Sequence, residues 1–296
     1  MRKIFETYRA VLIVLLFFLI ANIALAGFIV ARATSSQNIE IYFLDVGQGD
    51  SQLVILPDSN GGKGGIRVLI DGGPSNARIL AELDDILGGQ DRYLDMIVMT
   101  HPQEDHFGGL IDVIKNYDVG TFISSGRKTD AQSYQNLIQL LSEKEISYIS
   151  LSEGDVITYG DSYFSVLGPA KKFITSNDLN DSSIVLLLTH NMFHSLFTGD
   201  IGFAVEKDII KSIKDVSIQL LKVGHHGSRF ASSEIFLESL HPLAAIIQVG
   251  KNSYGHPTEE VLTRLENIGA NVLRNDKDGT IKVVVNDDTI DILKRK

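Results

Sequence analysis

The chain has 296 residues, 44% of them hydrophobic, which is enough for one large domain or two small ones with a substantial core. It contains no cysteine, which excludes disulfides, thiolate metal ligands and a cysteine nucleophile. Its net charge is −10, and because residues 1–35 carry +3, the remainder carries −13. So acidic a chain is a poor electrostatic match for extended nucleic acid.

The N-terminal segment has the pattern of a membrane helix. Residues 11–30 are apolar except for Asn22, and the basic residues Arg2, Lys3 and Arg9 precede them. About 20 such residues span a bilayer, and basic residues in front predict that everything after the span lies outside the cytoplasm. A cleavable signal peptide is the alternative. The apolar run exceeds the ~7–15 residues usual in one, so we expect an uncleaved anchor and short linker over residues 1–35.

The rest of the chain alternates between strand and helix patterns. Strands are predicted at 39–44, 52–56, 67–70, 94–99, 121–123, 148–149, 156–159, 163–167, 184–188, 195–198 and 218–223. Helices are predicted at 77–87, 110–117, 133–144 and 203–211, and a further one opens with Pro257 near its start. No linker divides residues 36–296, so we expect one α/β domain of two mixed sheets between helices.

A dense group of metal-competent side chains follows the strand at 94–99. His101, Asp105 and His106 lie within six residues, on what we expect to be a tight loop leaving that strand. Imidazole nitrogens and a carboxylate oxygen suit zinc, and also manganese or iron. The pattern therefore predicts a metal site.

Other polar residues stand at the ends of further predicted strands. They are Asp45, Asp50, Asp71, Asp200, His225, His226 and His256. In open α/β sheets ligands bind beyond the strand ends, so we expect these residues to converge although they are far apart in sequence.

These motifs resemble those of the metallo-β-lactamase superfamily, and most closely the hydrolase domain of ComEC-type competence proteins. The resemblance covers nearly all of residues 38–285 and rests on six segments in order: 44–51, 69–73, 101–109, 197–200, 220–228 and 254–257. It implies an αββα sandwich of two mixed β-sheets between helices, with a hydrolase domain over residues 36–296.

The resemblance also implies a metal site that is only partly conserved. The superfamily's metal loop has histidines at its first, third and sixth positions and aspartate at its fifth. His101, Asp105 and His106 match, but Gln103 replaces the second histidine. A further histidine is expected about two dozen residues before the bridging aspartate, where the chain has Asn180 instead. One metal ion is therefore expected rather than two.

The implied metal ligands are His101, Asp105, His106, Asp200 and His226. His226 is preferred to His225 because the family's ligand directly precedes a glycine, and His225 is expected to orient its neighbour by a hydrogen bond. Zinc is the expected ion. Asp181 is a candidate to complete a first site of hard oxygen ligands, which would favour manganese.

The catalytic candidates are Asp105 and His256. A divalent metal lowers the pKa of a bound water toward ~7, and the resemblance implies that Asp105 orients that water. His256 is expected to contact a substrate phosphate or protonate a leaving group; a buried histidine bonded to the backbone is the equal alternative.

Further polar residues have other expected roles. Asp71 is expected to brace its hairpin and the metal loop. Asp45, Gln48 and Asp50 lie on a glycine loop that either reaches the rim of the site or forms a tight turn. The remaining histidines, His190, His194 and His241, are expected to be bystanders.

The predicted function is a membrane-anchored, extracytoplasmic, metal-dependent hydrolase of phosphodiesters. The resemblance suggests single-stranded nucleic acid as substrate and a link to DNA uptake, although one apolar span cannot form a DNA pore by itself. The alternatives are a hydrolase of another ester or amide, such as a lipid headgroup, a cell-wall component or a β-lactam, and a non-catalytic binding protein that retains the fold.

Overall fold

The computed structural model describes residues 38–58, 65–213, 215–286 and 289–295, together with Phe18 and Asn22. Two compact units divide the chain: residues 1–37 with 57–65, and residues 38–56 with 66–296. In the first unit Phe18 and Asn22 are helical, and the Asn22 amide donates to the Phe18 carbonyl. Within the described part of the chain, no helix has the length and apolar character to cross a bilayer. The predicted anchor at 1–35 lies almost wholly outside the described residues.

The second unit contains two β-sheets. The eight-stranded sheet has the order β15-β14-β1-β2-β3-β4-β5-β6 and the seven-stranded sheet the order β13-β12-β11-β10-β9-β8-β7. The first comprises β1 (Ile39–Phe43), β2 (Gln52–Leu56), β3 (Ile66–Ile70), β4 (Tyr93–Met99), β5 (Asp118–Ser124), β6 (Ser147–Ser150), β14 (Thr280–Val285) and β15 (Ile290–Arg295). The second comprises β7 (Val156–Tyr159), β8 (Ser162–Gly168), β9 (Val185–His190), β10 (Phe193–Phe197), β11 (Leu220–Lys222), β12 (Ala244–Ile247) and β13 (Asn271–Arg274).

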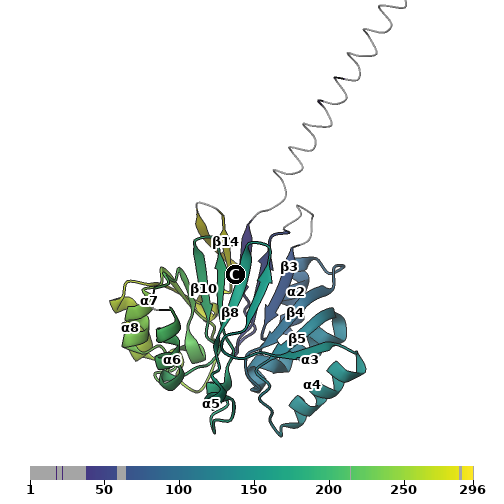
Figure 1. The fold of residues 1–296 in the computed structure, drawn as a ribbon, viewed down its shortest axis with the longest axis horizontal. Helices are drawn as coiled ribbons and strands as arrows, with labels where there is room; N and C mark the ends of the chain where they lie inside the picture. The colour runs from purple at the N-terminus through teal and green to yellow at the C-terminus, as the bar shows by residue number, and fades with distance from the viewer. Residues whose placement is uncertain are drawn as a thin grey trace, which may run out of the picture. The chain divides into compact units, whose positions relative to one another are not determined.

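Helices cover the outer face of each sheet (Figure 1). On the eight-stranded sheet lie α2 (Arg78–Leu87), α3 (Glu104–Asn116) and α4 (Gln132–Glu143); on the seven-stranded sheet lie α6 (Phe203–Ile213), α7 (Glu234–Leu240) and α8 (Glu259–Asn267). Short helices complete the unit: α5 (Lys171–Ile174), η1 (Asn180–Ser182), η2 (Gly224–Gly227) and α9 (Asn275–Asp278). The expected sandwich of two mixed sheets between helices is confirmed.

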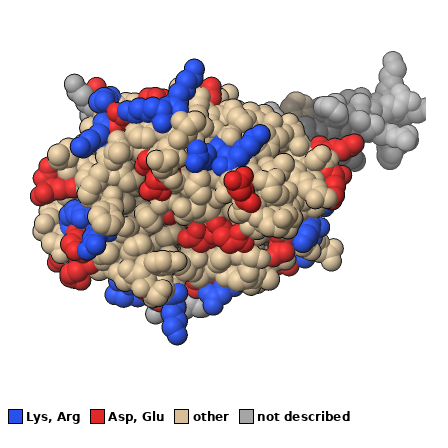
Figure 2. All heavy atoms as spheres, turned by 90° about the horizontal axis from the view of Figure 1, so that it is seen from below, with Lys and Arg blue, Asp and Glu red and all other residues tan. Residues whose placement is uncertain are grey.

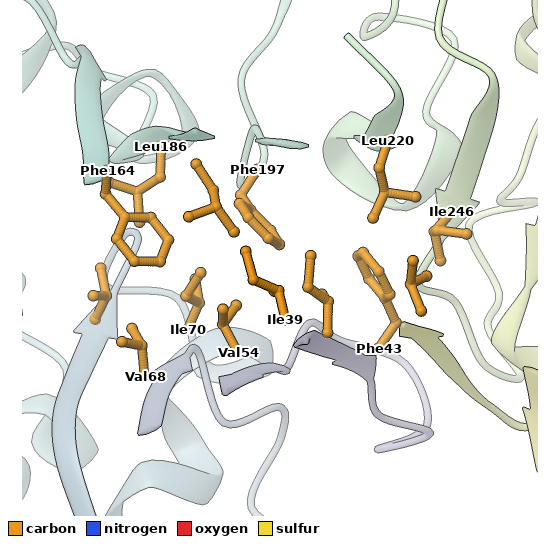
Figure 3. Close-up of a cluster of buried hydrophobic side chains, with 14 of the residues drawn as sticks. Ile39, Phe43, Val54, Val68, Ile70, Phe164, Leu186, Phe197, Leu220 and Ile246 are labelled. Carbon is orange, nitrogen blue, oxygen red and sulfur yellow. The ribbon is translucent and has the colours of Figure 1, made fainter. Parts of the chain in front are cut away.

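The core between the two sheets is apolar. Side chains such as Phe43 and Ile70 of one sheet face Phe197 and Ile246 of the other, as Figure 3 shows. Strand side chains alternate between the two faces of a sheet, so the intervening residues pack against the helices in two further apolar clusters. Burial on both faces holds the sheets rigidly, and their strand ends can therefore position polar groups accurately.

The structure corrects some element boundaries. The helix expected at 110–117 begins at Glu104, so Asp105 and His106 lie in the first turn of α3 rather than on a loop. Burial of Phe107 and Leu110 on the same helix face explains the early start, because tertiary packing outweighs the two glycines between them. The last predicted helix begins at Glu259, after Thr258 as its N-cap residue.

Glycines let α3 approach the end of β3 closely. The Gly72 amide donates to the His106 carbonyl (2.7 Å), and the Gly109 amide donates to the Gly73 carbonyl (2.9 Å). A Cβ atom at Gly109 would lie 2.1 Å from the Gly72 carbonyl oxygen. Only glycine fits this contact, which sets the distance between the helix carrying His106 and the strand end.

This contact can be tested by substitution. Gly109→Ala is expected to lower the free energy of unfolding by about 2 kcal/mol or more, because the added methyl group must displace backbone. Gly89→Ala is the control, since a Cβ there meets its nearest atom at 3.9 Å, and its effect should stay within about 0.5 kcal/mol. Urea denaturation measures both, and equal stability of the two variants would show that the α3 contact is not tight.

Candidate metal centre

The candidate residues gather at one edge of the sandwich. Asp71 comes directly after β3, and Thr100 alone separates His101 from the end of β4. These two strands are parallel, so their carboxyl ends are adjacent. In the other sheet β10 and β11 are also parallel, and they lead to Asp200 and His226. A contact of 3.3 Å between His106 Nε2 and Asp200 Oδ2 joins the two sheets' edges. Most of the residues expected to converge at the strand ends do so: Asp50, Asp71, His101, Asp105, His106, Asp200 and His226 form groups of neighbouring ligand atoms, and Asp45 belongs to none of the groups found among the described residues.

One group of ligand atoms consists of His101, His106 and Asp200, whose nearest ligand atoms all lie within 4.8 Å of one another. Both Nε2 atoms and Asp200 Oδ2 are buried, and within the described residues none has a hydrogen-bond partner. Buried polar atoms are nearly always paired. These three atoms make no hydrogen bond to the described residues, although His106 Nε2 and Asp200 Oδ2 are 3.3 Å apart. Their convergence fits a divalent metal ion, and the mixture of nitrogen and oxygen suits zinc or manganese.

A second group shares His106 and adds Asp105 and His226. His226 Nε2 lies 3.2 Å from Asp105 Oδ2 and 3.4 Å from Asp200 Oδ2. The Asp105 side chain is 34% exposed, whereas those of His106 and His226 are at most 3% exposed. Asp105 therefore marks the side on which solvent and a substrate would reach the centre.

Hydrogen bonds orient His106 and His226 through their Nδ1 atoms. His106 Nδ1 lies 2.9 Å from Asp71 Oδ2, and His226 Nδ1 lies 2.9 Å from the Gln248 carbonyl oxygen. An acceptor on Nδ1 fixes the tautomer that leaves Nε2 free, which is the usual arrangement around a metal-binding histidine. Asp71 thus has the bracing position expected for it.

Thr100 fixes the tautomer of His101 by a simple count of protons. Its amide donates to Asp71 Oδ1 (2.8 Å) and its hydroxyl donates to Asp71 Oδ2 (2.7 Å). The hydroxyl has a single proton, so at its 3.0 Å contact with His101 Nδ1 it must accept. His101 Nε2 therefore carries the free lone pair.

The three histidines of the centre differ in their pKa values. Burial and the neighbouring His106 lower the pKa of His101 to about 3, so its imidazole is neutral at pH 7. Burial also acts to lower the pKa of His226, but Asp200 and Asp50 outweigh it and raise this pKa to about 10. Burial opposes the charge on His106 too, yet Asp200 and Asp71 raise its pKa well above the usual value. A metal ion at the centre would replace these protons.

Asp105 and Asp200 remain ionised despite their burial. Desolvation alone would raise the pKa of Asp105 and of Asp200. The hydrogen bond from His226 and the charge of His106 hold the Asp105 pKa below its usual range. The charges of His226, His106 and Lys222 do the same for Asp200. Both side chains therefore present carboxylates, the form in which a metal ligand must be.

Three site residues were missed or left undecided by sequence reasoning. Asp50 is fully buried, 3.3 Å from His226 Nδ1, and so lies inside the centre rather than in an isolated turn. Lys222 is fully buried and contacts Asp50 and Asp200. The sequence feature that could have pointed to Lys222 is a charged residue directly after the apolar pair of β11 (Leu220–Lys222). Asn180 is 7% exposed and its Oδ1 has no partner among the described residues.

Asp181 and His225 differ from their expected roles. Asp181 accepts a hydrogen bond from Ser176 at its Oδ2 (2.7 Å) and belongs to none of the groups of ligand atoms found among the described residues. His225 Nδ1 lies 3.4 Å from Asn180 Nδ2, and the His225 ring packs edge-on against the His226 ring. His225 thus touches its neighbour through a ring contact rather than the expected hydrogen bond.

The remaining candidates lie at the rim or elsewhere. His256 stacks edge-on with His225 at 5.5 Å, its backbone is bonded to Asn252, and its buried Nδ1 has no partner among the described residues. Gln103 is the N-cap residue of α3. Asp45 pairs with Arg78 at 3.7 Å. The expected bystanders lie in β9 (His190), in β10 (His194) and at the end of α7 (His241).

Comparison with known families identifies the fold. The model of the metallo-beta-lactamase superfamily matches residues 46–251. This chain belongs to that superfamily. Metallo-β-lactamase-fold hydrolases are metal-dependent, and the His/Asp groups described above are of the kind that binds a metal ion.

Curated relatives of this metallo-β-lactamase-fold chain include competence proteins. ComE operon protein 3 of Bacillus subtilis is 30% identical over 259 residues, which cover 82% of this chain and 32% of that protein. Recombination protein 2 of Haemophilus influenzae is 27% identical over 265 residues, 88% of this chain and 31% of that protein. Competence protein ComA of Neisseria gonorrhoeae is also 27% identical. The expected resemblance to competence proteins is confirmed, and the chain spans about a third of these relatives' length.

Solved structures share the fold at low sequence identity. The metallo hydrolase Igni18 of Ignicoccus hospitalis superposes with a TM-score of 0.55 at 15% identity, covering 83% of this chain and 98% of that one. The metallo-beta-lactamase fold protein YhfI of Bacillus subtilis superposes with a TM-score of 0.52 at 11% identity, covering 81% and 98%. These similarities concern the fold alone.

The bracing role of Asp71 predicts a loss of metal affinity on substitution. Asp71→Asn keeps an oxygen for Thr100 but removes the charge that orients His106, so affinity should fall about 10–100-fold. Asp45→Asn, which removes a partly exposed carboxylate paired with Arg78, is the matched control and should bind as the wild type does. Competition with a chromogenic chelator measures both, and equal affinities would contradict the role.

Metal affinity should rise with pH. His106 and His226 have raised pKa values, so below about pH 10 a metal ion must displace protons from them. Each displaced proton makes the affinity rise on the order of tenfold per pH unit across this window. Calorimetry at pH 7 in two buffers of different ionisation enthalpy measures the released protons. Binding without proton release would contradict the pKa directions.

Proposed function

We propose that the chain hydrolyses phosphodiester bonds with one divalent metal ion, zinc or manganese. The proposed ligands are His101, Asp105, His106, Asp200 and His226. The observation that carries the proposal is the set of unpartnered imidazole and carboxylate atoms at an edge that Asp105 opens to solvent. When bound, the ion lowers the pKa of a coordinated water and stabilises negative charge on the substrate's oxygens.

The count of one ion follows from the missing imidazoles. Gln103 and Asn180 stand where the superfamily's first site has histidines, and amide oxygens are weak ligands for zinc. His101 alone contributes an imidazole there. The same loss disfavours a β-lactam substrate, because a depleted first site is poorly equipped to polarise a ring carbonyl.

The chain's own residues supply proton handling and orientation. Asp105 is ionised at neutral pH and about one third exposed, so it can accept a hydrogen bond from an attacking water and hold its proton. Burial and the neighbouring His225 and His226 lower the pKa of His256. A neutral His256 is better suited to donate a hydrogen bond to a substrate phosphate than to protonate a leaving group.

A row of rings leads from the centre toward solvent and supports an organic phosphodiester as substrate. The rings of His226 and His225 are 6.1 Å apart, those of His225 and His256 5.5 Å, and those of His256 and Tyr254 5.8 Å. Tyr254 is 73% exposed and could stack on a nucleobase or another ring. The names of two curated relatives refer to recombination and competence, and they favour nucleic acid as the phosphodiester.

Surface charge limits the kind of nucleic acid. Figure 2 shows a face on which acidic side chains gather near the middle and groups of Lys and Arg are separated by other residues. This face has no continuous basic stripe of the kind that extended duplexes need. The proposed substrate is therefore a short or single-stranded phosphodiester.

Location is a part of the same proposal. The apolar residues 11–30, preceded by Arg2, Lys3 and Arg9, support a membrane anchor over residues 1–35 with the hydrolase domain of residues 36–296 outside the cytoplasm.

Neighbouring histidines provide the test of function. His226→Ala should lose bound metal and lower the turnover of bis(p-nitrophenyl) phosphate on the order of 100-fold or more, because it removes a ligand. His225→Ala is the matched control and should retain its metal. Elemental analysis accompanies the assay on the full chain. A folded wild-type protein without metal or turnover would favour the alternative of a non-catalytic binding protein. Bound metal without phosphodiesterase activity would favour another ester or an amide as the substrate.

A further inference from the structure

Lys222 is the only lysine or arginine among the buried residues of the described chain. It ends β11, where strand alternation places its side chain on the same face as Leu220, which lies in the core between the sheets. Its ammonium group contacts Asp50 Oδ2, lies 3.5 Å from Asp200 Oδ1 and donates to the Gly199 carbonyl (2.9 Å). A lysine so placed is held by charge, since a buried ammonium group needs partners.

The partners of Lys222 also belong to a group that could bind a cation. Ligand atoms of Asp50, Asp200 and His226 lie within 4.8 Å of one another, and all three residues are buried. Two buried carboxylates at such a short distance repel each other unless a positive charge lies between them. Lys222 provides that charge without any ion.

We propose that Lys222 is a permanent cation of the metal centre. It neutralises Asp50, occupies the position that an ion between Asp50 and Asp200 would need, and leaves Asp200 Oδ2 for the single metal ion. This inference rests on the proposed metal centre and adds to it a reason for the count of one ion. Lys222 acts through the carboxylates that it holds, so it is a positioning residue and takes no part in the chemical step.

The test counts ions and measures stability on the full chain, with Mn²⁺ as the probe. Lys222→Met removes the charge and keeps a long apolar stem. Lys222→Met combined with Asp50→Asn removes one charge of each sign. Lys211→Met is the control, since Lys211 is a mostly exposed lysine of α6 that pairs with Asp208. Equilibrium dialysis with elemental analysis gives ions per chain, and thermal melts are recorded with chelator and with Mn²⁺.

Wild type and Lys211→Met are expected to bind one ion. Lys222→Met should bind one ion more than the wild type, and its melting temperature in chelator should fall by about 10 °C and recover with Mn²⁺. Adding Asp50→Asn should restore the wild-type ion count and most of the melting temperature in chelator, because the charges again balance.

Other outcomes overturn the inference in distinguishable ways. Equal ion counts in Lys222→Met and the wild type would refute the role of Lys222 but not the metal centre. No ion in the folded wild type would refute the metal centre itself. If Lys222→Met does not fold even with Mn²⁺, the double variant decides. A folded double variant with the wild-type ion count supports charge compensation, and a double variant that also fails to fold overturns it.

Discussion

Uncompensated charge out of water is the constraint on which the rest of this centre depends. Asp50, Asp71 and Asp200 are carboxylates with at most 1% exposure, brought together at one edge of the sandwich. Isolated ionised carboxylates are very costly to bury. The fold meets this constraint in three ways: hydrogen bonds from Thr100 to Asp71, the ammonium group of Lys222 beside Asp50, and imidazoles beside all three. The imidazole and carboxylate atoms of the site that make no hydrogen bond to the described residues converge at the candidate metal centre.

The backbone determines how accurately the side chains of this centre are positioned. Parallel strands deliver His101 and Asp200 from rigid sheets, and the amide–carbonyl contacts of Gly72 and Gly109 fix the first turn of α3 against the end of β3. Sites carried by regular elements are held more exactly than sites on loops. His106, which lies in a helix rather than on a loop, is therefore held firmly in place.

The centre combines the superfamily's geometry with its own chemistry. The fold is shared with proteins below 16% identity, and folds of this kind host many activities, so function must be argued from the site. Here the departures are specific. The amides of Gln103 and Asn180 replace imidazoles, and a lysine contacts the proposed bridging aspartate. The single ion proposed above rests on these departures.

The sequence by itself determined the strand order of the motifs, the alternation that makes two mixed sheets, and the candidate ligands His101, Asp105, His106, Asp200 and His226. The strands and the group His101, Asp105 and His106 depend on local pattern: apolar runs that end in polar residues, and ligand types at short spacing. Asp200 and His226 are expected as ligands because the motifs resemble those of the superfamily. Tertiary structure alone decided that α3 begins at Glu104, because the burial of its apolar face outweighs local glycines. It alone brought Asn180 and Lys222 into the centre, and it decided that Asp50 lies there rather than in a separate tight turn. These three are separated by up to 172 positions, and only the pairing of distant strands sets their distances. The net charge gathered at the site follows from that arrangement.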